Sequence, residues 1–282
     1  MPSLPSRALA ALLATGLVAG GIVAVAVAQT DEPPPTAAFT LGAKKSTPKG
    51  PATLPAGAVR FVVGTKSKGE HSFLLVRVAD GADIPALQAR VRKVNSGDKF
   101  EAITELSAVG GTQVSTTTKG NLTVVLKPGN YLFVDVSDDN ISTSIPVTVA
   151  GDPATAPRLP AAPTTVSLSD FKYTVTGALP RNGVVRLANK GKRNHMLVNF
   201  KAQNAAGAAR MIKALKTNKE KAFDKEIRGI GPSVFLIGPG ERQNLKFSTR
   251  PGSYVFVCFY ESKQSGGKPH FTKGMIKAVT VK

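Results

Sequence analysis

The chain has 282 residues, a single cysteine and a formal net charge of +19 at pH 7. One cysteine cannot form an intramolecular disulfide, so a disulfide-stabilised secreted scaffold is excluded. The charge favours an anionic partner, but the chain has no tryptophan and no basic run interleaved with aromatic residues, so nucleic acid is not expected as that partner.

The N-terminal segment, residues 1–28, is typical of an export signal. One arginine, Arg7, precedes an apolar stretch from Ala8 to Ala28 that ends in Ala26-Val27-Ala28. This ending matches the A-x-A cleavage pattern of secretory signals, and an apolar run of about 20 residues could also remain as a membrane anchor. We therefore expect the rest of the protein to lie outside the cytoplasm, either secreted or tethered to the membrane.

Two segments rich in proline and alanine divide the remaining chain. Residues 29–55 show no apolar periodicity and are interpreted as an extended linker, and residues 151–165 are interpreted as a second linker. The segments that they bound, 56–150 and 166–282, each have the size of one small domain.

The two segments contain an internal repeat. Gly69–Arg77 parallels Arg193–Lys201, with a histidine at the third position of each, and Leu126–Asp135 parallels Thr249–Cys258, with Pro-Gly-x-Tyr in both. Self-similarity at this scale indicates two copies of one fold.

Short runs of β-branched and aromatic residues between turn residues predict an all-β fold of two tandem Greek-key β-sandwiches. An Ala-rich amphipathic stretch after each His-bearing strand predicts one inserted helix per copy, at Ile84–Val94 and Ala205–Leu215. The predicted strands are Val59–Val63, Phe73–Val78, Leu122–Leu126, Tyr131–Val136 and Pro146–Ala150, then Lys172–Thr176, Val184–Ala188, Met196–Phe200, Val234–Ile237, Asn244–Phe247, Tyr254–Tyr260 and Ile276–Val281.

The second copy carries a candidate metal site. His195 opens one strand, and Cys258, His270 and Met275 follow one another on and after a later strand. Two imidazoles, one thiolate and a weak axial thioether form the donor set of a mononuclear blue-copper site. Strand alternation places Cys258 on the same face as Tyr254, Phe256 and Tyr260, and the polar loop that follows is expected to return His270 and Met275 to it. The alternative is that Cys258 and Met275 are core residues and His270 lies in an exposed loop.

These motifs resemble the cupredoxin, or type 1 copper, family. The similarity covers about Val166 to Lys282: an Asn-His pair opening a strand, a Pro-Gly-x-Tyr strand ending in cysteine, then histidine and methionine before the last strand. It implies that His195, Cys258 and His270 are equatorial copper ligands and that Met275 is the axial ligand. The eleven residues between Cys258 and His270 make a longer loop than in the small electron carriers of the family.

The first copy resembles the same fold without the site. It keeps a histidine, His71, at the matching place but has Asp135 where Cys258 stands, and Thr143 matches Met275. We do not expect His71 to bind metal.

Together these features predict an exported copper-binding protein that transfers single electrons through one copper site and is not an enzyme. Its redox partner is unknown and is expected to be acidic, and anionic envelope polymers or a membrane surface are further possible partners. The alternative is a metal-free cell-envelope β-sandwich that binds through its basic surface.

Overall fold

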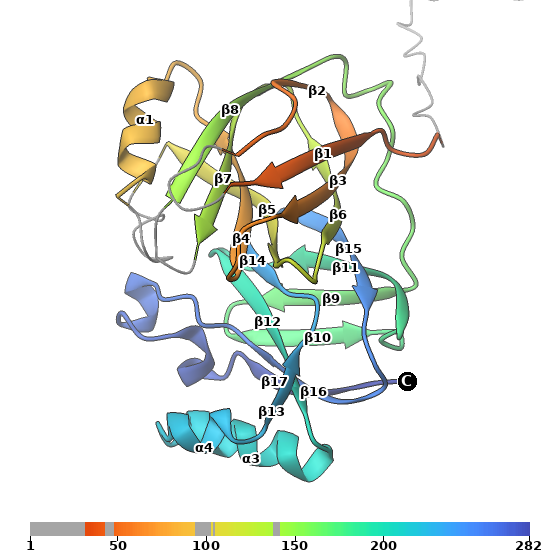
Figure 1. The fold of residues 1–282 in the computed structure, drawn as a ribbon, viewed down its shortest axis with the longest axis vertical. Coiled ribbons are helices and arrows are strands. Elements are labelled where there is room, and N and C mark those ends of the chain that lie inside the picture. The colour runs from red at the N-terminus through yellow and green to blue at the C-terminus, as the bar shows by residue number, and fades with distance from the viewer. Residues whose placement is uncertain (1–31, 43–47, 94–102, 104, 138–141) are drawn as a thin grey trace, which may run out of the picture.

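The computed structural model describes residues 32–42, 48–93, 103, 105–137 and 142–282. Within them the protein is all-β, with two β-sandwiches in tandem and one inserted helical segment in each, as the sequence predicted (Figure 1). The predicted signal or anchor, residues 1–28, lies outside the described residues. No helix in the described part of the chain is long and apolar enough to cross a membrane.

In the described residues, the first sandwich has eight strands. One layer contains β1 (Thr36–Leu41), β3 (Gly57–Thr65) and β6 (Gly120–Leu126). The other layer contains, in spatial order, β2 (Thr53–Pro55), β8 (Ser142–Ala150), β7 (Gly129–Ser137), β4 (His71–Val78) and β5 (Leu106–Val114), with helix α1 (Ile84–Val91) inserted after β4.

The second sandwich repeats this plan. One layer contains β15 (Arg242–Ser248), β11 (Asn182–Asn189), β9 (Thr164–Ser169) and β10 (Lys172–Thr176). The other contains β13 (Ile227–Ile230), β12 (His195–Ala202), β16 (Gly252–Val257) and β17 (Ile276–Val281), with β14 (Val234–Ile237) also paired to β12, and helices α3 (Ala205–Lys216) and α4 (Glu220–Asp224) follow β12.

Matching details show that the halves are copies of one fold. β1 pairs in parallel with β3, and β9 pairs in parallel with β11. The Tyr131 hydroxyl donates to the Lys127 carbonyl at 2.8 Å, and the Tyr254 hydroxyl donates to the Arg250 carbonyl at 2.7 Å, so each Pro-Gly turn is closed in the same way. The helices share a start signal too, because an Asx side chain, Asp83 or Asn204, caps α1 and α3 respectively.

The linker prediction for residues 29–55 was wrong where the structure forms strands. Thr36–Leu41 is β1 and Thr53–Pro55 is β2, since Ala37, Phe39 and Leu41 alternate into the core of the first sandwich. The high proline and alanine content of the segment masked the alternation of buried and exposed residues that is typical of a strand.

Other elements were missed because their local signals are weak. β5 carries Gly110-Gly111 at its centre, which lowers its intrinsic strand preference. Gly111 is required by a close backbone contact, since a Cβ there would lie 2.3 Å from the Phe73 carbonyl oxygen, and a Cβ on Gly110 would displace the Gln243 side chain, whose Oε1 would lie 2.3 Å away. Strands β9 and β13 and the five-residue α4 were also not predicted. The predicted helix to Val94 ends at Val91 in the structure.

The two halves share one seven-stranded sheet, because β6 pairs antiparallel with β15. The buried Gln243 side chain extends this seam: Gly111 N–H donates to its Oε1 at 3.0 Å and its Nε2 donates to the Gly111 carbonyl at 3.1 Å. Thr112 Oγ1 also donates to the Ser233 carbonyl across the seam at 3.0 Å. The segment between β8 and β9 lies against the same sheet, where Ala58 N–H donates to the Pro157 carbonyl at 2.8 Å.

We expect Gln243→Ala to lower the free energy of unfolding by about 2 to 4 kcal/mol, since it leaves a buried N–H and a buried carbonyl of Gly111 without partners. Urea unfolding measures this change. Lys246→Ala, on the exposed face of the same strand, is the control and should change stability little. Equal unfolding midpoints for the two variants would contradict the role of Gln243.

Candidate metal centre

Two paired strands bring His195 and Cys258 to the same end of the second sandwich. His195 is the first residue of β12 and Cys258 follows the last residue of β16. β12 pairs with β16 at Val198 opposite Val257, so the register continued by one residue sets Leu197 opposite Cys258. The histidine therefore lies two residues along β12 from the point that faces the cysteine.

The side chains of β16 alternate between two hydrophobic cores, as predicted. Tyr254, Phe256 and Cys258 belong to the main core, whereas Val255 and Val257 belong to a second core against α3. Cys258 is fully buried on the inner face. Strand geometry thus fixes the direction of the thiol.

The loop after Cys258 folds back on itself and returns His270 to the cysteine. An isolated bridge joins Glu261 to Pro269. His270 N–H then donates to the Tyr260 carbonyl at 2.9 Å, and Phe271 N–H donates to the Cys258 carbonyl at 3.0 Å. These bonds hold His270 beside Cys258 although eleven residues separate them.

Met275 enters the same network through its backbone. Cys258 N–H donates to the Met275 carbonyl and Met275 N–H donates to the His270 carbonyl, each at 3.1 Å. Gly274 makes the turn before Met275, with φ of 110°, a conformation that favours glycine. The Met275 side chain is fully buried in the main core.

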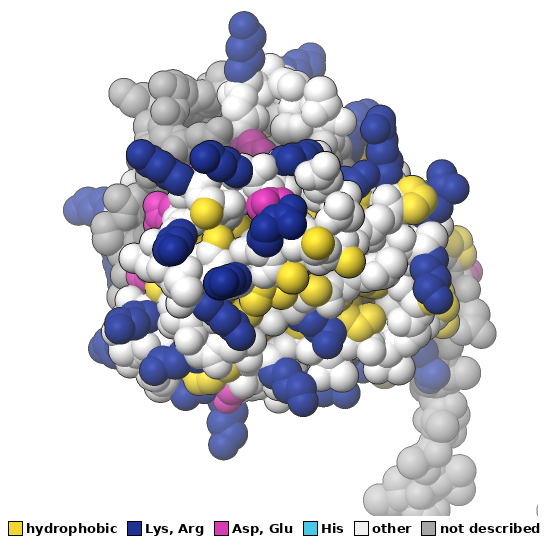
Figure 2. All heavy atoms as spheres, turned by 90° about the horizontal axis from the view of Figure 1, so that it is seen from below, with side chains coloured by type: hydrophobic (Ala, Val, Ile, Leu, Met, Phe, Trp, Pro, Cys, Tyr) yellow, Lys and Arg dark blue, Asp and Glu magenta, His cyan; other side chains and the backbone are white. Residues whose placement is uncertain are grey.

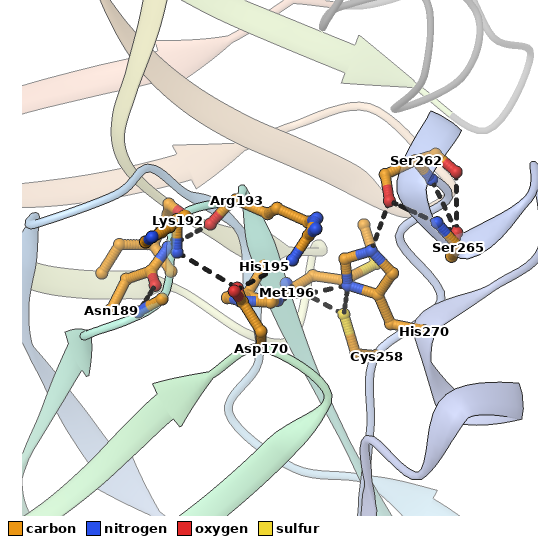
Figure 3. A network of polar contacts seen from close by, with 12 residues as sticks. Asp170, Asn189, Lys192, Arg193, His195, Met196, Cys258, Ser262, Ser265 and His270 are labelled. Carbon is orange, nitrogen blue, oxygen red and sulfur yellow. Dashed lines mark hydrogen bonds and ion pairs between the residues drawn. The ribbon is translucent and has the colours of Figure 1, made fainter.

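Three donor atoms converge at this point (Figure 3). His195 Nδ1 lies 3.2 Å from His270 Nδ1, and Cys258 Sγ lies 3.7 Å from His270 Nδ1. All three ligand atoms lie within 4.8 Å of one another, and all three side chains are buried. The predicted exposed-loop alternative for His270 therefore does not match its position in the structure.

The sulfur of Cys258 lies in a closed, mostly apolar environment. Met196 N–H donates to Sγ at 3.4 Å, and the Tyr173 hydroxyl donates to the Met196 carbonyl at 2.5 Å. Burial raises the pKa of the Cys258 thiol to about 12, and the Met196 N–H lowers it in part. In the absence of a cation the thiol is therefore protonated at neutral pH.

The outer hydrogen bonds of His270 leave its Nδ1 free for a ligand. Ser262 Oγ donates to Ser265 Oγ at 3.3 Å, so it accepts from His270 Nε2 at 3.0 Å. With its hydrogen on Nε2, His270 presents a bare Nδ1 to His195 and Cys258. Outer partners of this kind orient metal-binding imidazoles and fix their tautomer.

His195 has a different outer partner. Its Nε2 lies 3.5 Å from Asp170 Oδ1 and makes no hydrogen bond within the described residues. If the ring hydrogen of His195 is on Nε2, the unprotonated Nδ1 atoms of His195 and His270 face one another at 3.2 Å. If the hydrogen is on Nδ1 instead, the lone pair of His195 Nε2 points toward the Asp170 carboxylate. Either arrangement leaves one contact unfavourable, and a cation between the Nδ1 atoms would relieve it. The donor set therefore fits a soft, imidazole- and thiolate-binding metal such as copper.

Both imidazoles are held neutral by their surroundings. Burial lowers the pKa of His195 to about 4, with a further lowering from His270, and Asp170 acts in the opposite direction. Burial also lowers the pKa of His270 to about 4, helped by the positive charge of Arg193. Neutral imidazole is the form that binds metal.

The turn before β12 is held by a buried asparagine. Asn189 Nδ2 donates to the carbonyls of Arg193 and Ile237 at 2.6 and 2.9 Å, and its Oδ1 accepts from Gly191 N–H at 2.9 Å. Gly191 allows a close approach, since a Cβ there would lie 2.8 Å from His195 Nε2. This turn brings Arg193 Nη1 to 2.9 Å from Asp170 Oδ2 and His195 Nε2 to 3.5 Å from Asp170 Oδ1.

The turn between β9 and β10 covers the site. Phe171 has a positive φ of 63°, which is uncommon for a bulky residue. Its ring meets the His270 ring edge-on with centroids 4.9 Å apart, and Arg193 lies over its face at 5.4 Å. Asp170 in the same turn binds Arg193, with Oδ2 2.9 Å from Nη1.

The first half shows the same position without a metal donor set. His71 pairs with Ser137 and Asp135 pairs with Thr143 in the β-ladders, so Asp135 occupies the register of Cys258 and Thr143 that of Met275. His71 Nδ1 lies 2.8 Å from Asp135 Oδ1, and both side chains are buried. Here a carboxylate partner, rather than a thiol and a second imidazole, satisfies the buried histidine.

Reasoning from the sequence missed the outer residues of the site, Asp170, Phe171, Arg193 and Ser262. Ser262 had a detectable signal, because Ser262 and Ser265 form a reciprocal capping box that starts a short 3₁₀ turn. Asp170 had none, since its approach to His195 depends on the pairing of β9 with β11.

No family model matches the chain, and no curated protein matches it. Among solved structures, auracyanin from the photosynthetic bacterium Roseiflexus castenholzii is similar over 42% of this chain and 94% of its own, with 21% identity and a TM-score of 0.28. Auracyanin B covers 42% of this chain and 86% of its own at 22% identity and a TM-score of 0.27. Lac15 from a marine microbial metagenome covers 82% of this chain and 64% of its own at 14% identity and a TM-score of 0.26.

We expect the metal-free protein to lose stability as the pH falls from about 6.5 to about 4. The folded-state pKa of His195 and His270 is about 4, below the ordinary value of 6.5. Between these two pH values the unfolded chain binds more protons than the folded chain. The free energy of unfolding therefore rises with pH in this range. His270→Gln should reduce the slope by roughly 1 kcal/mol per pH unit near pH 5. Urea unfolding at several pH values measures the slope, and an unchanged slope in the variant would show that His270 is not buried as a neutral group.

Proposed function

We propose that the second half of the chain binds one copper ion in a type 1 site and that the protein carries single electrons. The observation that supports this most strongly is the convergence of one ligand atom each from His195, His270 and Cys258 within 4.8 Å in the buried interior. Bound copper would supply a one-electron couple between Cu(I) and Cu(II). The ligand roles of these three residues are part of the proposal.

The rigidity of the ligand positions supports electron transfer. His195 is fixed at the start of β12, and Cys258 is tied by backbone hydrogen bonds to Phe271 and Met275. Ser262 orients the His270 ring. Side chains held in this way need little rearrangement when the charge at their centre changes, which favours rapid electron exchange.

Met275 is proposed as the axial ligand. Its backbone hydrogen-bonds to both Cys258 and His270, and its side chain is fully buried in the main core that also contains Cys258. A weak thioether on the axis raises the preference for Cu(I) and tunes the potential. The aromatic rings of Phe171 and Tyr260, which meet His270 edge-on at 4.9 and 5.3 Å, would keep water from the centre.

We propose a carrier rather than an enzyme. All three donor side chains are buried, which suits the exchange of electrons better than direct contact with a substrate. The competing function is a metal-free cell-envelope β-sandwich that binds through its charge. It accounts for the basic surface but not for a buried thiol facing two neutral imidazoles.

The charge supports an acidic redox partner. Lys and Arg side chains are spread over the face seen in Figure 2, with few Asp or Glu among them. Five exposed lysines lie on or beside α3 and α4: Lys213, Lys216, Lys219, Lys221 and Lys225. Anionic envelope polymers or a membrane surface would be attracted in the same way. The apolar segment 8–28 supports a place outside the cytoplasm for this exchange.

Titration of the purified protein with Cu(II) tests the function. One equivalent should produce an intense visible thiolate-to-copper band, and Cys258→Ser should abolish it. The serine variant is the matched control, because it keeps the volume and both imidazoles. A colourless wild type with its thiol confirmed reduced would reject the type 1 site and favour the metal-free binding protein.

Copper binding should also release about one proton per ion near pH 6. At this pH the Cys258 thiol, with a pKa of about 12, is protonated, and the two imidazoles, with a pKa of about 4, are neutral. Only the thiol therefore has a proton to lose when it becomes a ligand. A pH indicator in weakly buffered solution measures the release. Cys258→Ser should release close to none, and equal release from both proteins would exclude thiolate ligation.

A further inference from the structure

A second feature of the molecule is a cleft between the two halves. It has a volume of about 490 Å³. It is lined from the first half by β4, β5, β6, β7 and the β6–β7 turn, and from the second half by the β11–β12 and β14–β15 turns. This volume is in the range of small-ligand sites in proteins, roughly 300 to 1,000 Å³. The cleft does not include the candidate metal ligands.

The walls of the cleft are fixed to one another. Gly238 N–H from the second half donates to the Ala108 carbonyl of the first half at 3.0 Å. The contact is so close that a Cβ on Gly238 would lie 2.3 Å from that carbonyl oxygen. Gln243 binds Gly111 nearby, and β6 pairs with β15. A ligand would therefore meet a preformed site and would not have to order it.

The lining is strongly basic. Arg77 and Lys127 come from the first half, Lys192 and Arg193 from the second, and Glu241 is the one acidic residue in the lining. Asp170, outside the lining, pairs with Arg193, and Glu241 can neutralise at most one of the other three cations. The two halves thus bring positive charges close together across the seam. These charges repel one another, and a bound anion would reduce this repulsion.

Two of the guanidinium groups have unused donors. Arg77 Nε and Arg193 Nε are buried, and neither has a hydrogen-bond partner within the described residues. The other contacts of these groups hold them in place: Arg77 Nη2 donates to the Pro128 carbonyl at 3.3 Å, and Arg193 Nη1 lies 2.9 Å from Asp170 Oδ2. Both arginines line the cleft, and their guanidinium charge would attract an oxyanion bound there.

We propose that this cleft is a binding site for a small polyvalent oxyanion, a molecule with at least two carboxylate or phosphate groups. Arg77 and Lys127 would bind one end, and Lys192 and Arg193 the other. Val109, Val125 and Pro239 in the lining would contact the apolar part of the ligand. A concave site of this size fits a small molecule better than the flat surface of a partner protein.

Isothermal titration calorimetry of the metal-free full chain with citrate and, separately, with pyrophosphate tests the proposal at fixed ionic strength. We expect saturable binding of at least one anion, with citrate alone indicating a carboxylate ligand and pyrophosphate alone a phosphate ligand. Arg77→Gln and Lys127→Gln should each weaken binding about tenfold or more, as expected for a charge-assisted hydrogen bond.

Lys246→Gln, which removes an exposed charge on β15 outside the cleft, is the control and should weaken binding less than twofold. Cys258→Ser should bind the anion as the wild type does, so the result is independent of whether copper binds. The absence of saturable binding for both anions would overturn the proposal. An equal loss in the Lys246 variant would also overturn it, because the attraction would then be diffuse.

Discussion

The pairing of β12 with β16 is the constraint on which the candidate metal centre depends. It sets the start of one strand, His195, beside the end of the other, Cys258. The same pairing separates two hydrophobic cores, since Phe256 and Cys258 face one and Val255 and Val257 face the other. A shift of one residue would turn the thiol to the wrong core, so burial of these large side chains enforces the register of the site.

The contrast between the halves shows how one position can be satisfied in two ways. In the first half the buried His71 is paired with Asp135, a carboxylate in the register of Cys258. In the second half the histidine faces a protonated thiol and another neutral imidazole, and neither supplies a charge to pair with it. In the first half, Asp135 stabilises the buried histidine without any added ion. In the second half, the thiol and the two imidazoles would be stabilised by a bound cation.

The seam between the halves joins the two sandwiches through backbone pairing and side-chain hydrogen bonds. The pairing of β6 with β15 joins one layer of each sandwich into a single sheet. The Gln243 side chain hydrogen-bonds to both the N–H and the carbonyl of Gly111. Two consequences follow from this seam. It holds the basic cleft open as a preformed site, and Arg193 connects that cleft through Asp170 to the surroundings of His195. The proposed anion site and the proposed copper site therefore lie on one polar network.

The sequence alone predicted most of the strands, the repeat and the candidate ligands His195, Cys258, His270 and Met275, because period-two alternation and turn residues are local properties of the chain. It also predicted the face on which Cys258 lies. It could not predict that β1 belongs to the sheet, that Gly110-Gly111 lies within a strand, that Ser262 hydrogen-bonds the outer nitrogen of His270, or that Asp170 lies near the outer nitrogen of His195. Those features depend on contacts between residues far apart in the chain, and only the tertiary structure, which closes the loop over Cys258 and joins the halves at Gln243, decides which of them form.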